Sequence, residues 1–220
     1  MSHTTKPFSI TTQQLVIFIA ILLVIRIIAY FIVKNRPESN KFFFSEKIDA
    51  EIYEYIDSIV IAGIAALIII TYIIRPFYIP SESMVPTLKV NDYIIVNEFI
   101  YRFKKPQRGD VIVFHPPKSA NADDKEYIKR IIAVAGDTIE VKNGKVILNG
   151  AVQNEPYINA PCDYNMSEFT VPEGNLFMLG DNRPNSGDSH IWGPLPVKNI
   201  VGKAVAIIWP IIPRRIGIIK

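Results

Sequence analysis

Cysteine and histidine are scarce in this 220-residue sequence, which contains one cysteine and three histidines. Cys162 has no partner for an intramolecular disulfide, so we expect an unpaired thiol and cannot read the redox compartment from cysteine content. His3, His115 and His190 are scattered along the chain, and no group of cysteines and histidines has the spacing of a zinc site. We therefore predict no metal and no cofactor.

An excess of charge of one sign is also lacking. The 24 basic and 21 acidic residues give a net charge of +3 at pH 7. This balance is too weak to indicate nucleic-acid binding, and the sequence contains no DNA-binding or RNA-binding motif. A mild basic bias does fit a protein that works beside anionic lipid. We expect membrane lipid as a partner and no nucleic acid.

Hydrophobic residues make up 49% of the chain and are concentrated in two runs in its first third. Residues 15–33 and 56–75 are each close to the roughly 20 residues that cross a bilayer, although Arg26 interrupts the first run. No small-residue cleavage site follows the first run, so we interpret it as a retained anchor and not as a cleavable signal peptide. These runs predict two transmembrane helices in a multi-pass protein of the inner or plasma membrane.

The charges beside the two runs predict how the chain is oriented. The segment between them, 34–55, carries Lys34, Arg36, Lys41 and Lys47, whereas the N-terminal tail, 1–14, has only Lys6 among its lysines and arginines. Basic loops are retained in the cytoplasm. We therefore expect 34–55 to be a cytoplasmic connector and 76–220 to lie on the extracytoplasmic side.

Residues 76–220 are enough for one domain with its own core, and their pattern is mostly that of strands. Runs rich in β-branched and aromatic residues recur between turn-forming segments, at 92–101, 110–116, 126–136, 175–180 and 202–210. Strands do not alternate with helices, which favours a mostly β fold with a partly closed antiparallel sheet.

Two parts of this domain stand apart from the main strand pattern. Asn143-Gly144 lies between alternating residues and predicts a β-hairpin. We expect 137–172 to form a small second lobe around that hairpin. The apolar tail, 207–220, fits two alternatives, a buried final strand or a segment that lies on a lipid surface.

The stretch IPSESMVPTL, residues 79–88, presents two serines one residue apart. In extended backbone Ser81 and Ser83 point to the same side, and Pro80 and Pro86 restrict the chain around them. A stiff loop with exposed hydroxyls suits a nucleophile, although an ordinary loop after a membrane anchor has the same composition.

A serine nucleophile needs a base, and the sequence offers two kinds. His190, with Asp188 or Asp181, would complete a triad with Ser83. Lys129 is the rival, since it lies in an apolar strand pattern where Tyr127, Lys129 and Ile131 share one face. Burial would lower the pKa of this lysine and make it a general base, whereas a lysine on an edge strand would only reach solvent.

Four motifs, taken together and in order, resemble those of type I signal peptidases. They are IPSESMVPTL, RGDVIVF at 108–114, YIKRIIAVAGD at 127–137 and GDNRPNSGDSHIWG at 180–193. The resemblance covers nearly all of the domain. It implies a membrane-anchored serine endopeptidase in which Ser83 is the nucleophile and Lys129 the general base.

The resemblance also implies roles for the residues around this dyad. Ser81 would help to stabilise the oxyanion, and Ser186 would orient the lysine. Asp181 and Asp188 would hold the 180–193 loop, with Asp181 as the partner of Arg130. The implied substrate contacts are apolar side chains that line shallow pockets: Phe77, Ile79, Met84, Leu88, Tyr127 and Ile128.

Shallow pockets of this kind accept small side chains one and three positions before the cut, which is the cleavage pattern of secretory signal peptides. The expected partners are therefore secretory preproteins. Two residues depart from the family pattern. Glu82 stands where glycine is common and would be strained if that position needs a positive φ. His190 stands where a basic residue is common and would make a pH-dependent pair with Asp188.

Three other functions compete with this interpretation. A penicillin-recognising acyltransferase has a lysine three residues after its serine, and here Met84 and Pro86 occupy those positions. A self-cleaving regulator of the Ser/Lys type would carry a DNA-binding domain where this chain has two apolar runs. A non-catalytic, membrane-anchored β domain that binds exported proteins would not require Ser83, Lys129 and Ser186.

Overall fold

The computed structural model describes residues 12–34, 46–72, 74–120, 125–210 and 215–219, and it divides into two units, 1–73 and 74–220. In the first unit, helix α1 (Thr12–Lys34) packs against helix α2 (Glu46–Tyr72). Arg26 of α1 forms an ion pair with Asp57 of α2, so the cation that interrupts the first apolar run has a carboxylate partner.

The two helices cover most of the two apolar runs, but the bounds expected for the second helix, 56–75, are wrong at both ends. Helix α2 ends at Tyr72, because Ile74 and Arg75 pair with β2 as part of strand β1. Helix α2 begins at Glu46, so the second half of the expected connector, 34–55, is helical; it is free of proline and glycine and contains good helix formers. The rest of that connector and most of the 1–14 tail lie outside the described residues. Among the helices that the structure describes, none reaches the combination of length and apolar character that crossing a membrane requires.

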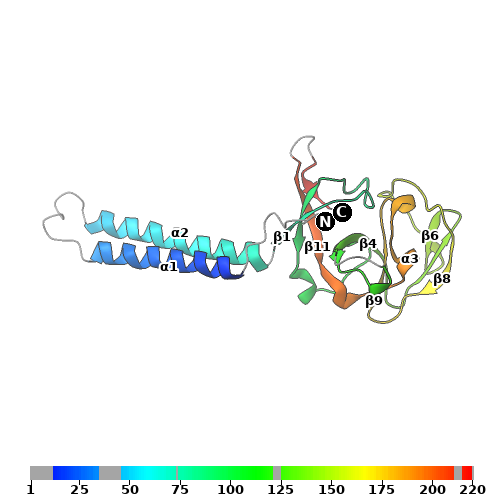
Figure 1. Ribbon diagram of the computed structural model, residues 1–220, viewed down its shortest axis with the longest axis horizontal. Helices are drawn as coiled ribbons and strands as arrows, with labels where there is room; N and C mark the ends of the chain where they lie inside the picture. The colour runs from blue at the N-terminus through cyan, green and yellow to red at the C-terminus, as the bar shows by residue number, and fades with distance from the viewer. Residues whose placement is uncertain (1–11, 35–45, 73, 121–124, 211–214, 220) are drawn as a thin grey trace. The chain divides into compact units, whose positions relative to one another are not determined.

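The second unit is built on a curled antiparallel sheet (Figure 1). Its strands are β1 (Ile74–Tyr78), β2 (Tyr93–Asn97), β3 (Val111–Phe114), β4 (Tyr127–Val134), β9 (Asn175–Leu179), β10 (Leu195–Pro196), β11 (Ile200–Trp209) and β12 (Gly217–Ile218). The order across the sheet is β1-β2-β11-β3-β4-β9-β10, with β12 paired to β11. The predicted mostly β, antiparallel fold is confirmed, and β11, late in the chain, lies between β2 and β3.

The segment expected to form a small lobe carries a second sheet of four strands. These are β5 (Thr138–Lys142), β6 (Lys145–Leu148), β7 (Ala151–Val152) and β8 (Met166–Thr170), in the order β7-β6-β5-β8. Asn143 and Gly144 connect β5 to β6 with φ angles of 53° and 75°, as a two-residue hairpin turn requires. The hairpin predicted from Asn-Gly is therefore present, and β7 and β8 extend it on both sides.

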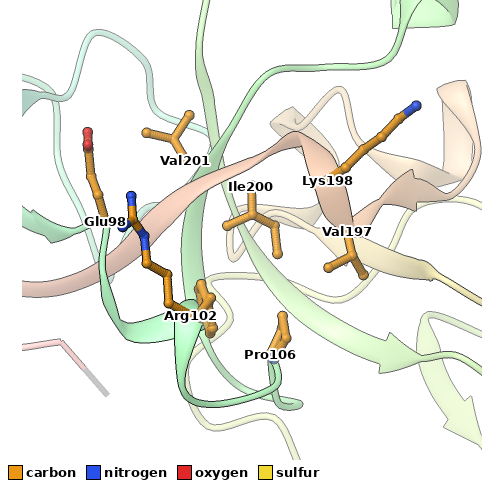
Figure 2. A pocket seen from close by; sticks show the side chains of 8 residues that line it. Glu98, Arg102, Pro106, Val197, Lys198, Ile200 and Val201 are labelled. Atoms are coloured by element: carbon orange, nitrogen blue, oxygen red, sulfur yellow. The ribbon is translucent and has the colours of Figure 1, made fainter.

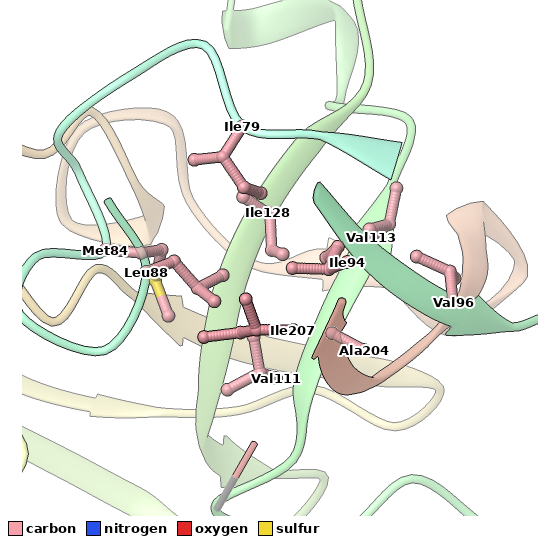
Figure 3. Packing of buried hydrophobic residues seen from close by; sticks show 10 residues of the cluster. All are labelled: Ile79, Met84, Leu88, Ile94, Val96, Val111, Val113, Ile128, Ala204 and Ile207. Carbon is pink, nitrogen blue, oxygen red and sulfur yellow. The ribbon is translucent and has the colours of Figure 1, made fainter. Parts of the chain in front are cut away.

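The main sheet is covered on both faces, which fixes the surroundings of its central strands. Val111 and Val113 of β3 face one apolar cluster, shown in Figure 3, and Ile112 and Phe114 face another. Strand β4 pairs with β3 on one side and β9 on the other. A residue of β4 is therefore central, and the edge-strand alternative for Lys129 is wrong.

Short helical turns link the strands. Three-residue 3₁₀ turns occupy Ile100–Arg102, Lys118–Ala120, Arg183–Asn185 and Val197–Asn199, and α3 (Ser189–Trp192) follows the 180–188 loop. The side chain of Asp188 accepts a hydrogen bond from the backbone N–H of His190 at the start of α3. This capping fixes the end of the loop that the fourth motif encodes.

Candidate active site

The serine stretch forms the turn-rich loop between β1 and β2, and apolar anchors hold it against the sheet. The N–H groups of Val85 and Leu88 donate to the carbonyls of Glu82 and Met84 at 3.0 and 2.8 Å. Met84 and Leu88 are 1% and 0% exposed and pack in the cluster of Figure 3. Because the residues on its C-terminal side are anchored in the core, Ser83 occupies a fixed position and is itself 7% exposed.

Lys129 of β4 reaches the hydroxyl of Ser83. The Lys129 Nζ to Ser83 Oγ distance is 2.7 Å, and Nζ also donates to the Ile128 carbonyl at 3.1 Å. Lys129 is 4% exposed. This burial lowers the pKa of Lys129 to about 8. The Asp188 and Asp181 carboxylates raise the same pKa, but their effect is smaller than that of burial. In a fraction of the protein molecules Lys129 is therefore neutral near physiological pH and can accept a proton.

The residues beside Ser83 define the surroundings of its hydroxyl. Ser81 is exposed, and its Oγ lies 3.3 Å from Ser83 Oγ. Asn182 donates through its backbone N–H to the Ser83 carbonyl at 3.1 Å and through its amide to the Glu82 carbonyl at 3.1 Å. Glu82 does not adopt a positive φ, unlike Asn91, Asn143 and Asn149, so the strain expected if this position needed one is absent.

Behind the dyad, three parts of the chain meet at Asp181. The Arg130 guanidinium donates to both Asp181 carboxylate oxygens, at 2.9 and 2.7 Å, and the two side chains are 2% and 0% exposed. Thr87, from the serine loop, donates to the same carboxylate at 2.5 Å. Asp181 thus ties the strand of Lys129, the loop of Ser83 and the 180–188 loop together through bonds that solvent does not weaken.

The histidine alternative is not supported by the contacts of His190. Its Nδ1 lies 2.6 Å from an oxygen of Asp188, and its ring stacks on Tyr164 with centroids 3.9 Å apart. The other Asp188 oxygen accepts from the Gly180 N–H at 3.0 Å. Among the described residues, the side-chain nitrogen that hydrogen-bonds Ser83 belongs to Lys129 and not to His190.

Ser186 lies in the same loop but does not make the expected contact. It is 8% exposed, and its Oγ has no hydrogen-bond partner in the described part of the chain, so it does not donate to Lys129 here. Its Oγ lies against Gly180 instead, where a Cβ added to that glycine would be 2.2 Å away. The backbone of Gly180 also faces Ser83, whose carbonyl oxygen would be 2.4 Å from the same Cβ.

Most of the predicted substrate-contact residues lie together in one apolar cluster. Ile79, Met84, Leu88 and Ile128 are at most 4% exposed and pack together (Figure 3), and Phe77 is partly buried against their cluster. Tyr127 packs in the other cluster, beside Phe114, and its ring centroid is 5.6 Å from Lys129 Nζ. Ile79, Met84, Leu88 and Ile128 are therefore core side chains with little surface open to a substrate, and Tyr127 lies beside Lys129.

A shallow hollow of about 240 Å³ lies elsewhere on the domain, as Figure 2 shows. Its lining residues are Glu98, Tyr101, Arg102, Pro106, Val197, Lys198, Ile200 and Val201. None of them belongs to the dyad or to the residues around it. Among the described residues, no three histidine, cysteine, aspartate or glutamate side chains are grouped closely enough to hold a metal ion.

Three residues of this site were not singled out by the sequence. Thr87 closes the network at Asp181, Asn182 holds the serine loop, and Gly180 allows the two loops to touch. All three lie inside motifs that the sequence had marked. Their roles come from contacts between residues about 90 to 100 positions apart, and no periodicity in the sequence reports such contacts.

Comparison with known proteins gives consistent matches. The family profile described as "Signal peptidase, peptidase S26" matches residues 52–209. The chain is 44% identical to "Signal peptidase I" of Leptolyngbya laminosa over 78% of this chain and 85% of that protein. It is 44% identical to "Probable signal peptidase I-1" of a Synechocystis strain, over 72% of this chain and 83% of that protein.

Further matches come from other bacteria. "Signal peptidase I" of Mycobacterium tuberculosis is 35% identical, with 73% of each chain covered. A crystal structure of a signal peptidase I from Enterococcus faecalis is 33% identical over 46% of this chain and 97% of that chain, with a TM-score of 0.38.

Proposed function

Because this chain belongs to the signal peptidase family, peptidase S26, we propose that it cleaves signal peptides from exported preproteins with Ser83 as nucleophile and Lys129 as general base. The observation that carries this proposal is the 2.7 Å contact between Ser83 Oγ and the buried Nζ of Lys129. A neutral lysine at this distance can take the hydroxyl proton as the serine oxygen attacks.

The steps follow from the positions of the two side chains. The Ser83 oxygen bonds to the carbonyl carbon of the scissile peptide while Lys129 takes its proton. The tetrahedral intermediate then collapses, the peptide C–N bond breaks, and Lys129 returns the proton to the leaving amine. In the second half, Lys129 takes a proton from a water molecule that attacks the acyl carbon. The bond between that carbon and Ser83 Oγ then breaks, and Lys129 returns the proton to Ser83.

Ser81 is the proposed donor to the oxyanion, together with the backbone N–H of Ser83. The Ser81 hydroxyl is exposed and 3.3 Å from the nucleophilic oxygen, so it borders the position that the substrate carbonyl must occupy. The substrate side chains one and three positions before the cut are small, such as alanine, which is the cleavage pattern of secretory signal peptides.

The proposal includes attachment to a membrane through residues 12–72, with the catalytic domain on the extracytoplasmic side. The support is the apolar sequence of α1 and α2 and the pairing of Arg26 with Asp57, which offsets the cost of a cation among apolar residues. We expect the full chain to stay in the membrane fraction after a carbonate wash and a variant lacking residues 1–73 to be released. Release of the full chain would contradict the anchor.

The experiment that tests the chemistry is incubation of the purified protein with one preprotein, with the cut site read by mass spectrometry. Ser83→Ala should remain folded by circular dichroism and lose cleavage by about 10³-fold or more. Ser167→Ala, at an exposed serine of β8, is the matched control and should cut normally. Full cleavage by Ser83→Ala would contradict the assignment of the nucleophile.

A further inference from the structure

A segment outside the four motifs holds the back of the catalytic site. Residues 153–162, here called the strap, form most of the connection between β7 and β8 in the smaller sheet. Two arginines lie on the site's side of the strap, Arg130 beside Lys129 in β4 and Arg183 in the 180–188 loop. Both are almost fully buried, at 2% and 1% exposure. A buried guanidinium needs partners for all of its N–H donors and its charge, and the strap supplies some of these partners for each arginine.

Glu155 of the strap is the carboxylate for Arg183. The Arg183 guanidinium donates to both Glu155 oxygens, at 2.9 and 2.6 Å, and the two side chains are 0% and 6% exposed. The Nε of the same arginine donates to the Gly180 carbonyl at 2.9 Å. Glu155 therefore fixes, through Arg183, the carbonyl of the glycine whose backbone lies against Ser83.

Tyr157 of the strap covers Arg130. The Arg130 Cζ lies 4.1 Å from the centroid of the Tyr157 ring, within the range of a cation–π contact. The Tyr157 hydroxyl donates to Glu155 at 3.0 Å, and the Asn159 N–H donates to the Asp181 carbonyl at 3.2 Å. The strap thus contacts both members of the Arg130–Asp181 pair and binds the loop directly at two residues, Asp181 and Arg183.

We propose that the strap is a positioning element for catalysis, in which Tyr157 and Glu155 hold Arg130 and Arg183 so that the 180–183 backbone keeps Ser83 in line with Lys129. None of these strap side chains touches the reacting atoms. Their effect passes through two further contacts, Asn182 N–H to the Ser83 carbonyl at 3.1 Å and the close approach of Gly180. The smaller sheet therefore serves the reaction, by presenting the strap.

This proposal rests on the proposed function, and one set of assays separates the two. The substrate is a short peptide with alanine one and three positions before the cut, and kcat and KM are measured for the full chain. The reaction is established first: the unmodified protein should cut the peptide, and Ser83→Ala should not. If the unmodified protein does not cut, or Ser83→Ala cuts equally well, the proposed function fails and the strap is not at issue.

The strap variants are Tyr157→Leu, Tyr157→Phe and Glu155→Gln. Tyr157→Leu should lower kcat about tenfold or more with KM changed less than about twofold, because misalignment of reacting groups slows the chemical step. Tyr157→Phe keeps the ring over Arg130 and should recover most of the lost kcat. Glu155→Gln, which leaves a buried guanidinium without its carboxylate, should also lower kcat.

A control separates positioning from simple loss of stability. Phe169 of β8 is partly buried against the apolar cluster between the two sheets, and it takes no part in the hydrogen bonds and ring contact that join Glu155 and Tyr157 to the two arginines. Phe169→Leu should lower the unfolding midpoint in urea while leaving kcat of the folded protein unchanged. Unchanged kcat in Tyr157→Leu, equal losses in Tyr157→Leu and Tyr157→Phe, or an equal loss of kcat in Phe169→Leu would each overturn the proposal.

Discussion

The pH dependence of cleavage is the most direct measure of whether buried Lys129 is the base. Its pKa falls from 10.5 to about 8, chiefly because burial disfavours the ammonium. At pH 7 about one lysine in ten is then neutral, compared with roughly 0.03% for a lysine of ordinary pKa. The burial is thus responsible for an increase of about 300-fold in the reactive form at that pH.

We expect kcat/KM to rise about tenfold per pH unit below pH 7 and to level off near pH 9. The assay is initial-rate hydrolysis of a peptide that has no group titrating between pH 6 and 10. Asp188→Asn should move the midpoint to lower pH, because Asp188 is the stronger of the two carboxylates that raise the pKa of Lys129. The amide oxygen of the asparagine can still accept from the Gly180 N–H.

Two results would refute this reasoning. A rate that keeps rising beyond pH 10 would mean that the lysine is not desolvated when it acts. A midpoint near the ordinary histidine pKa of about 6.5, lost in His190→Gln, would restore the histidine triad.

Three further predictions follow from the same contacts. Lys129→Met should raise the free energy of unfolding by about 3 kcal/mol at pH 7, because the lowered pKa of Lys129 means that the unfolded chain binds the proton more tightly than the folded chain does. This gain should shrink as the pH rises from 8 to 10.5. Equal urea midpoints for the two proteins at pH 7 would contradict the prediction. Gly180→Ala places a Cβ 2.2 Å from Ser186 Oγ and 2.4 Å from the Ser83 carbonyl oxygen, so we expect a loss of cleavage activity of about 100-fold. As a control, Gly187→Ala, where nothing lies within 4 Å of the added Cβ, should keep close to the normal cleavage activity in the same assay. His190→Gln should keep kcat/KM within roughly threefold, since loss of a true triad base costs about 10⁴-fold or more, and a loss of that size would show that His190 acts in the reaction.

The sequence predicted the class of fold because its signals were local. Alternating β-branched residues marked the strands, and Asn143-Gly144 marked a hairpin that the structure places at those two residues. It did not predict that β11 enters the sheet between β2 and β3, because that pairing joins residues about 100 positions apart and leaves no periodic trace.

The contact between Ser83 and Lys129 was expected from the order of the motifs, and its surroundings were expected only in part. Alternation placed Lys129 in a strand, but only the pairing of β4 with both neighbours shows that the strand is central and the lysine buried. For Glu155 and Tyr157 the sequence indicated only that they belong to the small lobe expected at 137–172. A glutamate and a tyrosine in a loop look solvated in sequence, and their partners, Arg183 and Arg130, are brought to them by the tertiary fold.

The position of β11 has a consequence for when the enzyme becomes active. Ser83 follows β1 and Lys129 lies in β4, and the two halves of the sheet that carry them are joined through β11. Residues 200–209 leave the ribosome after both of these side chains, so a nascent chain holds Ser83 and Lys129 in an unclosed sheet. We expect their contact, and the activity proposed for it, to form only after β11 has paired with β2 and β3.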